Sequence, residues 1–181
     1  MKKGVNELIL RAPISPRISI ENYILIGAFG VRTVGSLAPV TESPVRIGLG
    51  SVTGQGMSFY GAQITYRIPF SCRAGDLKVT ADYYNGTLIS VRLDGREAGK
   101  IVLPPYTLTV PEVAEGEHLL EMTLYASRIN TFGALHLCVP TGWKGPDMWY
   151  AEGSGWAYEY QLTDVGILKK PTLTLCPKAS H

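Results

Sequence analysis

The side chains best suited to chemistry in this sequence are aromatic, and they gather in one short stretch. An aromatic ring packs against the C–H face of a sugar while polar neighbours bind the hydroxyl groups. Trp143 and Trp149 lie in its glycine-rich part, so we predict that they contact a carbohydrate or a partner domain, with packing inside the loop as the alternative. Trp156 and Tyr160 alternate in a strand-like segment and are expected in the core or at a barrel end. The stretch contains Trp143, Trp149, Tyr150, Trp156, Tyr158 and Tyr160.

Four further side chains could join such a site. Alternation puts Arg67 on the polar face of its strand, where it is solvated, pairs with an acid or hydrogen-bonds a ligand. Tyr106 follows two prolines and is grouped with the aromatic loop. Asn130 most simply supplies turn geometry, and His136 can hydrogen-bond the backbone. The predicted ligand-binding set is Trp143, Trp149, Arg67, Tyr106, Asn130 and His136.

The motifs of common enzyme mechanisms are absent. The sequence has no HExxH, no Walker loop and no GxSxG. Its two GxG pairs, at 48–50 and 54–56, do not complete a GxGxxG. Glycoside hydrolysis needs two acids at a defined separation, and no pair stands out among the 15 acidic residues. We therefore predict that this chain has no catalytic residues, is not itself an enzyme and uses no cofactor.

Charge and cysteine content narrow the partners. The three cysteines and three histidines are scattered without CxxC spacing. This predicts reduced, mostly buried thiols and no metal site, with one disulfide left open. A net charge of +2 without a basic cluster disfavours nucleic acid and anionic membranes. No window approaches 18 uninterrupted apolar residues, so no membrane span is expected.

Composition and periodicity predict an all-β fold. Charged residues are 18%, against roughly 25% in an average domain, and period-2 segments alternate with turn signals. Asn85-Gly86 and Asp94-Gly95 each predict a hairpin turn, although Asn85-Gly86-Thr87 is also formally a glycosylation sequon. Residues 119–124 alternate, which favours a strand over a helix. The predicted strands are 5–11, 18–26, 59–70, 76–83, 87–93, 99–103, 106–110, 117–127, 134–139, 156–162 and 172–176, an antiparallel β-sandwich or jelly roll.

The beginning of the sequence suggests a fragment. Lys3 is followed by Gly4 and not by an apolar stretch, so no signal peptide is predicted here and localisation stays open. Residues 4–10 weakly repeat the pattern of 116–122, as expected if they form a strand of a preceding sandwich. Residues 27–58 read as an ordered connector. Its expected apolar anchors are Ile24, Ile26, Phe29, Val31, Val45 and Ile47.

Several motifs in order resemble the C-terminal part of bacterial glycoside hydrolases, namely family 2 β-galactosidases and α-L-rhamnosidase-like proteins. Residues 59–70 resemble the opening strand "YxGxxxYRxxF", and residues 104–110 resemble "PPYxxDI" without its Asp. Residues 91–99 resemble "VxVNGxxxG", with Asp94 for Asn, and residues 116–122 resemble "GxNxLxIxV", with His118 for Asn. Residues 130–136 resemble "NxxGxxH" and residues 156–171 the closing strand, while residues 21–31 resemble "ExxYLxGxFGV".

This resemblance implies a galactose-binding-like (sugar-binding-type) jelly roll that is not catalytic. It implies a tail of a preceding sandwich plus connector in 1–45, the jelly roll in 46–176 and a tail in 177–181. The implied partners are carbohydrate and a parent catalytic domain in cis. Two functions stay open, an accessory module that binds sugar and a structural sandwich that packs against its parent. The two Asn replacements are expected to sit in turns and to add nothing for a ligand.

Overall fold

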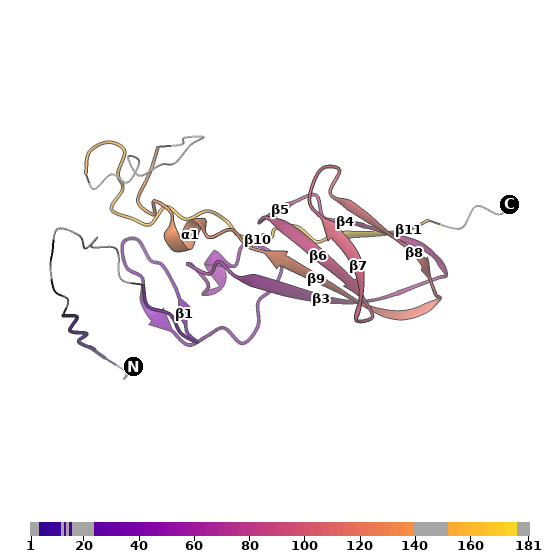
Figure 1. The fold of residues 1–181 in the computed structure, drawn as a ribbon, viewed down its shortest axis with the longest axis horizontal. Coiled ribbons are helices and arrows are strands. Elements are labelled where there is room, and N and C mark those ends of the chain that lie inside the picture. Colours follow the sequence, from indigo (N-terminus) through magenta and orange to yellow (C-terminus); the bar gives the residue numbers. More distant parts are fainter. Residues whose placement is uncertain (1–3, 12, 14, 16–23, 140–151, 177–181) are drawn as a thin grey trace.

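The computed structural model describes residues 4–11, 13, 15, 24–139 and 152–176, and their regular secondary structure is almost entirely β (Figure 1). In chain order the first elements are β1 (Gly30–Val31), β2 (Val40–Thr41), the 3-10 helix η1 (Thr53–Gln55), β3 (Gln63–Cys72), β4 (Gly75–Thr80), β5 (Tyr84–Asn85) and β6 (Leu88–Leu93). They are followed by β7 (Arg96–Ile101), β8 (Thr107–Val113), β9 (Gly116–Tyr125), α1 (Ile129–Phe132), β10 (Gly166–Ile167) and β11 (Thr172–Cys176).

Two antiparallel sheets form a sandwich. One sheet has the order β3-β9-β6-β7 and the other the order β11-β4-β8. Their facing side chains make one apolar core, because alternate residues of each strand point inward. Leu120, Met122 and Leu124 of β9 have no exposed surface, and Val79 of β4 and Val91 of β6 are equally buried. The predicted all-β antiparallel sandwich is confirmed, while its assignment as a jelly roll stays a prediction.

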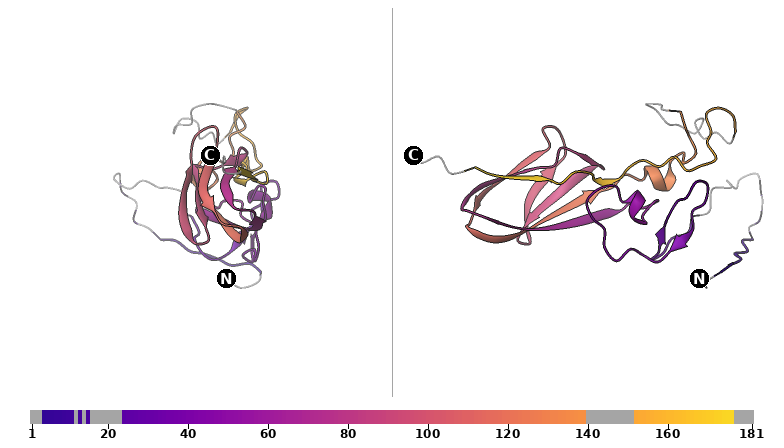
Figure 2. Two further views of the ribbon diagram at one scale, coloured as in Figure 1. Left: turned by 90° about the vertical axis from the view of Figure 1, so that its right-hand side faces the viewer. Right: turned by 180° about the vertical axis from the view of Figure 1, so that it is seen from behind.

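Beyond one end of the sandwich lie α1 and the segment that precedes β3 (Figures 1 and 2). Backbone hydrogen bonds attach that segment to the sandwich, from Gly50 N to Ile167 O and from Val52 N to Val165 O, both at 2.8 Å. Gly166 makes this close approach possible, because a Cβ there would lie 2.4 Å from the carbonyl oxygen of Gly50. The Tyr66 hydroxyl accepts a hydrogen bond from Ile167 N at the same place.

Seven predicted strands correspond to the long strands β3, β4, β6, β7, β8, β9 and β11. The Asp94-Gly95 hairpin is confirmed as a type I′ turn, because Asp94 and Gly95 have φ of 50° and 78° and the flanking Leu93 and Arg96 pair. The Asn85-Gly86 hairpin is wrong. Strands β4 and β6 belong to different sheets, and Asn85 instead pairs with Gly166 of β10.

Four other strand predictions do not hold. Residues 5–11 and 24–26 form no strand, and residues 18–23 lie outside the described residues. Segments 134–139 and 156–162 form only the isolated bridge between Leu137 and Trp156, and their other residues are turns, bends or irregular structure. No helix in the described part of the chain has the length and apolar character needed to cross a membrane.

The connector anchors are only partly as predicted. Ile47 packs against the core, and Val31 and Phe29 are half-buried. In contrast, Ile24, Ile26 and Val45 are 48%, 88% and 96% exposed. The connector is therefore anchored by Ile47 and Val52 and by backbone hydrogen bonds, and it leaves much of its other apolar surface open.

Candidate functional site

Asn130 holds the backbone and faces the interior. It is 1% exposed. Its Nδ2 donates to Thr163 O at 2.7 Å, and its Oδ1 accepts from Thr163 N at 2.9 Å. The amide thus replaces a strand partner for Thr163, and both of its polar atoms are occupied. Asn130 therefore has a structural part to play in the fold.

His136 lies in a row of aromatic rings, which we call the aromatic row, next to the hydrogen bonds between Asn130 and Thr163. Its Nδ1 donates to Ala157 O at 3.0 Å, as expected of a histidine that bonds to the backbone. Its ring centroid lies 4.8 Å from that of Tyr160 and 5.7 Å from that of Trp156. Phe59 and Tyr158 extend the row, and Tyr158 is 65% exposed. Trp156 and Tyr160 thus pack at the end of the molecule, outside the main core.

Arg67 pairs with an acid, one of the alternatives predicted for it. Its Nε lies 3.0 Å from Oε1 of Glu121, which is directly opposite on β9. The Arg67 side chain is 72% exposed and the Glu121 side chain 15%. This pair is on the open face of the four-stranded sheet.

The described members of the predicted ligand-binding set contact different partners. Arg67 has Glu121 as its partner, Asn130 has Thr163, and His136 has the aromatic row. Trp143 and Trp149 lie outside the described residues. A common ligand site for these residues therefore stays a prediction, and Tyr106 is treated separately below.

Tyr106 does line a hollow, which we call the tyrosine pocket. Its ring meets that of Tyr84 edge to face, with centroids 5.5 Å apart. Burial, and then the neighbouring Tyr106 phenol, raise the pKa of Tyr84, so this hydroxyl stays protonated. The cavity has a volume of about 370 Å³ and is lined by Asp82, Tyr84, Gly86, Thr87, Val102 and Tyr106. Sequence reasoning missed Asp82 and Tyr84, because it placed them in and beside a hairpin that does not exist.

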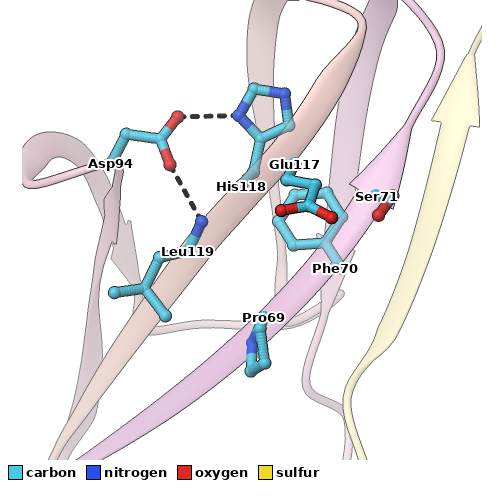
Figure 3. Close-up of a pocket in the computed structure, with 7 residues that line it drawn as sticks. All are labelled: Pro69, Phe70, Ser71, Asp94, Glu117, His118 and Leu119. Atoms are coloured by element: carbon cyan, nitrogen blue, oxygen red, sulfur yellow. Dashed lines mark hydrogen bonds and ion pairs between the residues drawn. The ribbon is translucent and has the colours of Figure 1, made fainter.

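A second hollow, of about 480 Å³, lies beside the β6–β7 turn and includes Phe70, Glu117, Asp94 and His118 (Figure 3). His118 Nδ1 lies 2.7 Å from Asp94 Oδ2, and Asp94 Oδ1 accepts from Leu119 N at 2.8 Å. The hydrogen bond to Asp94, and then the one to Ala114 O, raise the pKa of His118. The same His118 bond, and then Leu119 N, lower the pKa of Asp94. Asp94 is thus a bound carboxylate with both oxygens engaged.

The possible metal ligands and the cysteines form no cluster in the described residues. No group of three or more His, Cys, Asp or Glu in that part of the chain could hold a metal ion. The three cysteines are free in this structure, but Cys138 and Cys176 are exposed and Cys72 is half-buried. The expectation that these thiols are mostly buried was wrong, because 134–139 is not a core strand and Cys176 alternates outward on β11.

Comparison with known proteins gives structural neighbours only. No family model and no curated protein matches the chain. Similar solved structures include a GH2 beta-galacturonidase from Eisenbergiella tayi bound to galacturonate, at 21% identity and a TM-score of 0.42 over 80% of this chain and 22% of that one. Another is a rhamnosidase from Novosphingobium sp. PP1Y, at 17% identity and a TM-score of 0.48 over 90% of this chain and 16% of that one. The chain thus spans under a quarter of these glycoside hydrolases, and this similarity leaves the type of sandwich open.

Proposed function

We propose that this chain is a non-catalytic accessory domain of a larger glycoside hydrolase, and that the segment before β3 packs against another domain of that parent. The observation that carries this proposal is the apolar surface of residues 5–49. Among the residues that the structure describes, 20 large hydrophobic residues are exposed and twelve of them lie there, including Val34, Leu37 and Val40 at 59%, 67% and 45% exposure. Apolar surface gathered in this way is characteristic of a surface that another protein part covers.

The division of the chain into 1–45, 46–176 and 177–181 belongs to the same proposal. Ile47 and Val52 pack against the sandwich core, whereas Ile26 and Val45 are almost fully exposed. The sandwich buries its own core without help from the first 45 residues. Those residues are therefore free to serve a neighbouring domain, and the motif resemblance suggests what kind of parent that is.

A non-catalytic role agrees with the chemistry of the acids. Asp94 and Glu117 line one hollow, but both oxygens of Asp94 are bound by His118 and by the backbone of Leu119. A carboxylate held in this way cannot readily serve as the acid or the nucleophile of glycoside cleavage, which requires a group free to exchange protons or attack carbon.

The second candidate function is sugar binding by the aromatic loop around Trp143 and Trp149. The specific observation in its favour is the aromatic row, since Tyr158 is 65% exposed at the end of that row. An exposed ring is available to stack on a sugar.

The packing proposal is tested by measuring how a hydrophobic dye binds to the chain. The chain by itself should bind the dye in native buffer, and Val34→Ser/Leu37→Ser/Val40→Ser should lose most of that signal at an unchanged melting temperature. Adding the remaining polypeptide of the parent should suppress dye binding by the unmodified chain. The matched control is Leu103→Ser/Phe132→Ser, which removes apolar side chains of 75% and 53% exposure elsewhere. Equal dye loss in the control, or hydrolysis of aryl glycosides by the chain alone, contradicts the proposal.

A further inference from the structure

We propose that the tyrosine pocket binds a polyhydroxylated ligand of the sugar class that is neutral or carries an amine, and that it rejects sugar acids. This site is separate from the apolar segment of residues 5–49 and from the aromatic row. It goes beyond the proposed packing function, and either proposal can fail without the other.

The polar groups around the pocket lack partners within the described residues. Within the described residues, the hydroxyls of Tyr84, Thr87 and Tyr106 form no hydrogen bond, and neither does the Asp82 carboxylate. All four side chains line one cavity. Two phenols, one aliphatic hydroxyl and one carboxylate offer donors and acceptors within the same small volume. About 370 Å³ is near the lower end of the usual size of a small-molecule site. A compact ligand rich in hydroxyl groups matches this set.

The backbone fixes these side chains in advance. Tyr106 has a φ of 55°, an uncommon conformation for a residue other than glycine. It is held there because Tyr106 N donates to Leu103 O and Tyr106 O accepts from Ala81 N, both at 3.0 Å. Such a conformation is maintained by its surroundings and directs the phenol toward Tyr84.

The other walls are equally fixed. Thr87 N donates to Tyr125 O at 2.7 Å, and Tyr84 pairs with Ile167 of β10. A Cβ on Gly86 would lie 2.7 Å from Leu124 Cδ1, so the pocket floor is in direct contact with β9. Asp82 lies between two pinned residues, Ala81 and Tyr83, whose carbonyl accepts from Leu168 N. The backbone around the pocket therefore adds little ordering cost when a ligand binds.

The charge of the lining sets the class of ligand. Asp82 is the charged residue of the lining, which includes no Lys or Arg. A carboxylate accepts hydrogen bonds from vicinal hydroxyls or from an ammonium group, but repels another carboxylate. A neutral sugar or an amino sugar is thus compatible with the pocket, while a uronic acid meets an unpaired like charge.

The test uses two ligands that differ only at one carbon. Methyl galactoside and methyl galacturonide are titrated at pH 7 into the ¹⁵N-labelled chain while backbone amide shifts are followed. We expect the galactoside to shift the amides of Tyr84, Thr87 and Tyr106 and the galacturonide to bind at least about tenfold more weakly. Asp82→Asn should weaken galactoside binding and narrow that difference, and Tyr106→Phe should weaken it about tenfold.

Tyr60→Phe is the matched control, since it removes a phenol that bonds to Gln63 O, outside the tyrosine pocket and the aromatic row, and should leave galactoside binding unchanged. Melting temperatures of all variants show that each one folds. Equal affinity for the two glycosides, shifts centred on residues 152–160, or no shift with galactoside, rhamnoside or galactosamine would each overturn the proposal. None of these outcomes bears on dye binding by the apolar segment, so the two proposals are judged separately.

Discussion

The imidazole of His118 lies between two hydrogen-bond acceptors, the carboxylate of Asp94 and the carbonyl of Ala114. Nδ1 is 2.7 Å from Asp94 Oδ2, and Nε2 is 3.0 Å from Ala114 O. Neither acceptor can donate, so both ring nitrogens must carry a proton for both bonds to form. The geometry therefore describes an imidazolium that ties the β6–β7 turn to the crossover from β8 to β9.

Asp94 and His118 are the two positions at which this chain has another residue in place of the Asn of the glycoside hydrolase-like motifs. The sequence suggested two independent changes, both in turns. Asp94 is indeed in a turn, but His118 lies on β9, and its partner is Asp94. The replacements form one charged pair, which becomes visible only when the register of β6 with β9 is known.

The pair predicts a pH-dependent stability. The pKa of His118 is raised in the folded chain. Its contribution to the stability of the fold is therefore complete below the ordinary histidine pKa of about 6.5, and is lost as the pH rises through the higher folded pKa. Because the pKa of Asp94 is lowered, its contribution is complete above about 3.8 and is lost as the pH falls through the lower folded value. We expect the pair to stabilise most between about pH 4 and 6.5, and the melting temperature to fall by about 1–3 °C above that window, as suits a pair whose Asp94 side chain is 47% exposed and whose His118 side chain is 10% exposed.

Melting curves from pH 4 to 9 test this expectation, with Asp94→Asn as the comparison. The amide cannot form the ion pair, so its curve should lack the decline assigned to His118, while its oxygen can still accept from Leu119 N. Arg96 lies near Asp94, and Glu117 lines the same hollow as His118. An unchanged decline in Asp94→Asn would mean that another group is responsible.

Gly86 is predicted to be required for space and not for a turn. Its φ is not positive, and a Cβ would lie 2.7 Å from Leu124 Cδ1 and 2.9 Å from Tyr125 O. Gly86→Ala should therefore cost about 1–3 kcal/mol in the free energy of unfolding, because the backbone oxygen of β9 cannot move aside. Denaturant titration measures this cost. Gly54→Ala is the control, since a Cβ there meets nothing within 4 Å, and a similar loss in both variants would refute the steric explanation.

The same region shows what the sequence could and could not predict. Alternation in 117–127 and 59–70 identified β9 and β3, because each strand has one buried face that fixes its period. Asn85-Gly86 misled because its local propensity for a hairpin was overridden by the pairing of Tyr84 and Asn85 with β10, more than 80 residues later. Residues 134–139 and 156–162 have apolar alternation but are held by Asn130, the aromatic row and turns. Likewise, the sequence suggested Tyr106 as a ligand-binding residue, but that Asp82 and Tyr84 line the same hollow became visible only in the tertiary fold.

Arg67 is predicted to contribute little to stability and nothing to ligand binding in the tyrosine pocket. Its guanidinium is 72% exposed, and exposed ion pairs contribute less than about 1 kcal/mol. We expect Arg67→Ala to change the free energy of unfolding by no more than that, with a coupling to Glu121→Ala of the same small size in a double-mutant cycle. Galactoside binding should be unaltered, and a lost galactoside affinity would return Arg67 to the list of ligand-binding residues.

Asn130 is predicted to contribute far more to stability, although it lines neither of the two hollows described above. Asn130→Ala leaves Thr163 N and Thr163 O without their partners in a buried place, which should cost about 1–3 kcal/mol in the free energy of unfolding and speed hydrogen exchange at Thr163.

Asn130→Asp separates the effects of the two hydrogen bonds. At neutral pH its carboxylate still accepts from Thr163 N but repels Thr163 O, whereas a protonated acid can again donate. Its deficit relative to the unmodified chain should therefore shrink on acidification, while the deficit of Asn130→Ala stays. The control is Gln161→Ala, an exposed side chain that bonds only to Glu159 O within the described residues, and exchange at Thr163 should be unchanged there. Equal exchange rates at Thr163 in all three variants would show that the Asn130 side chain does not hold this segment.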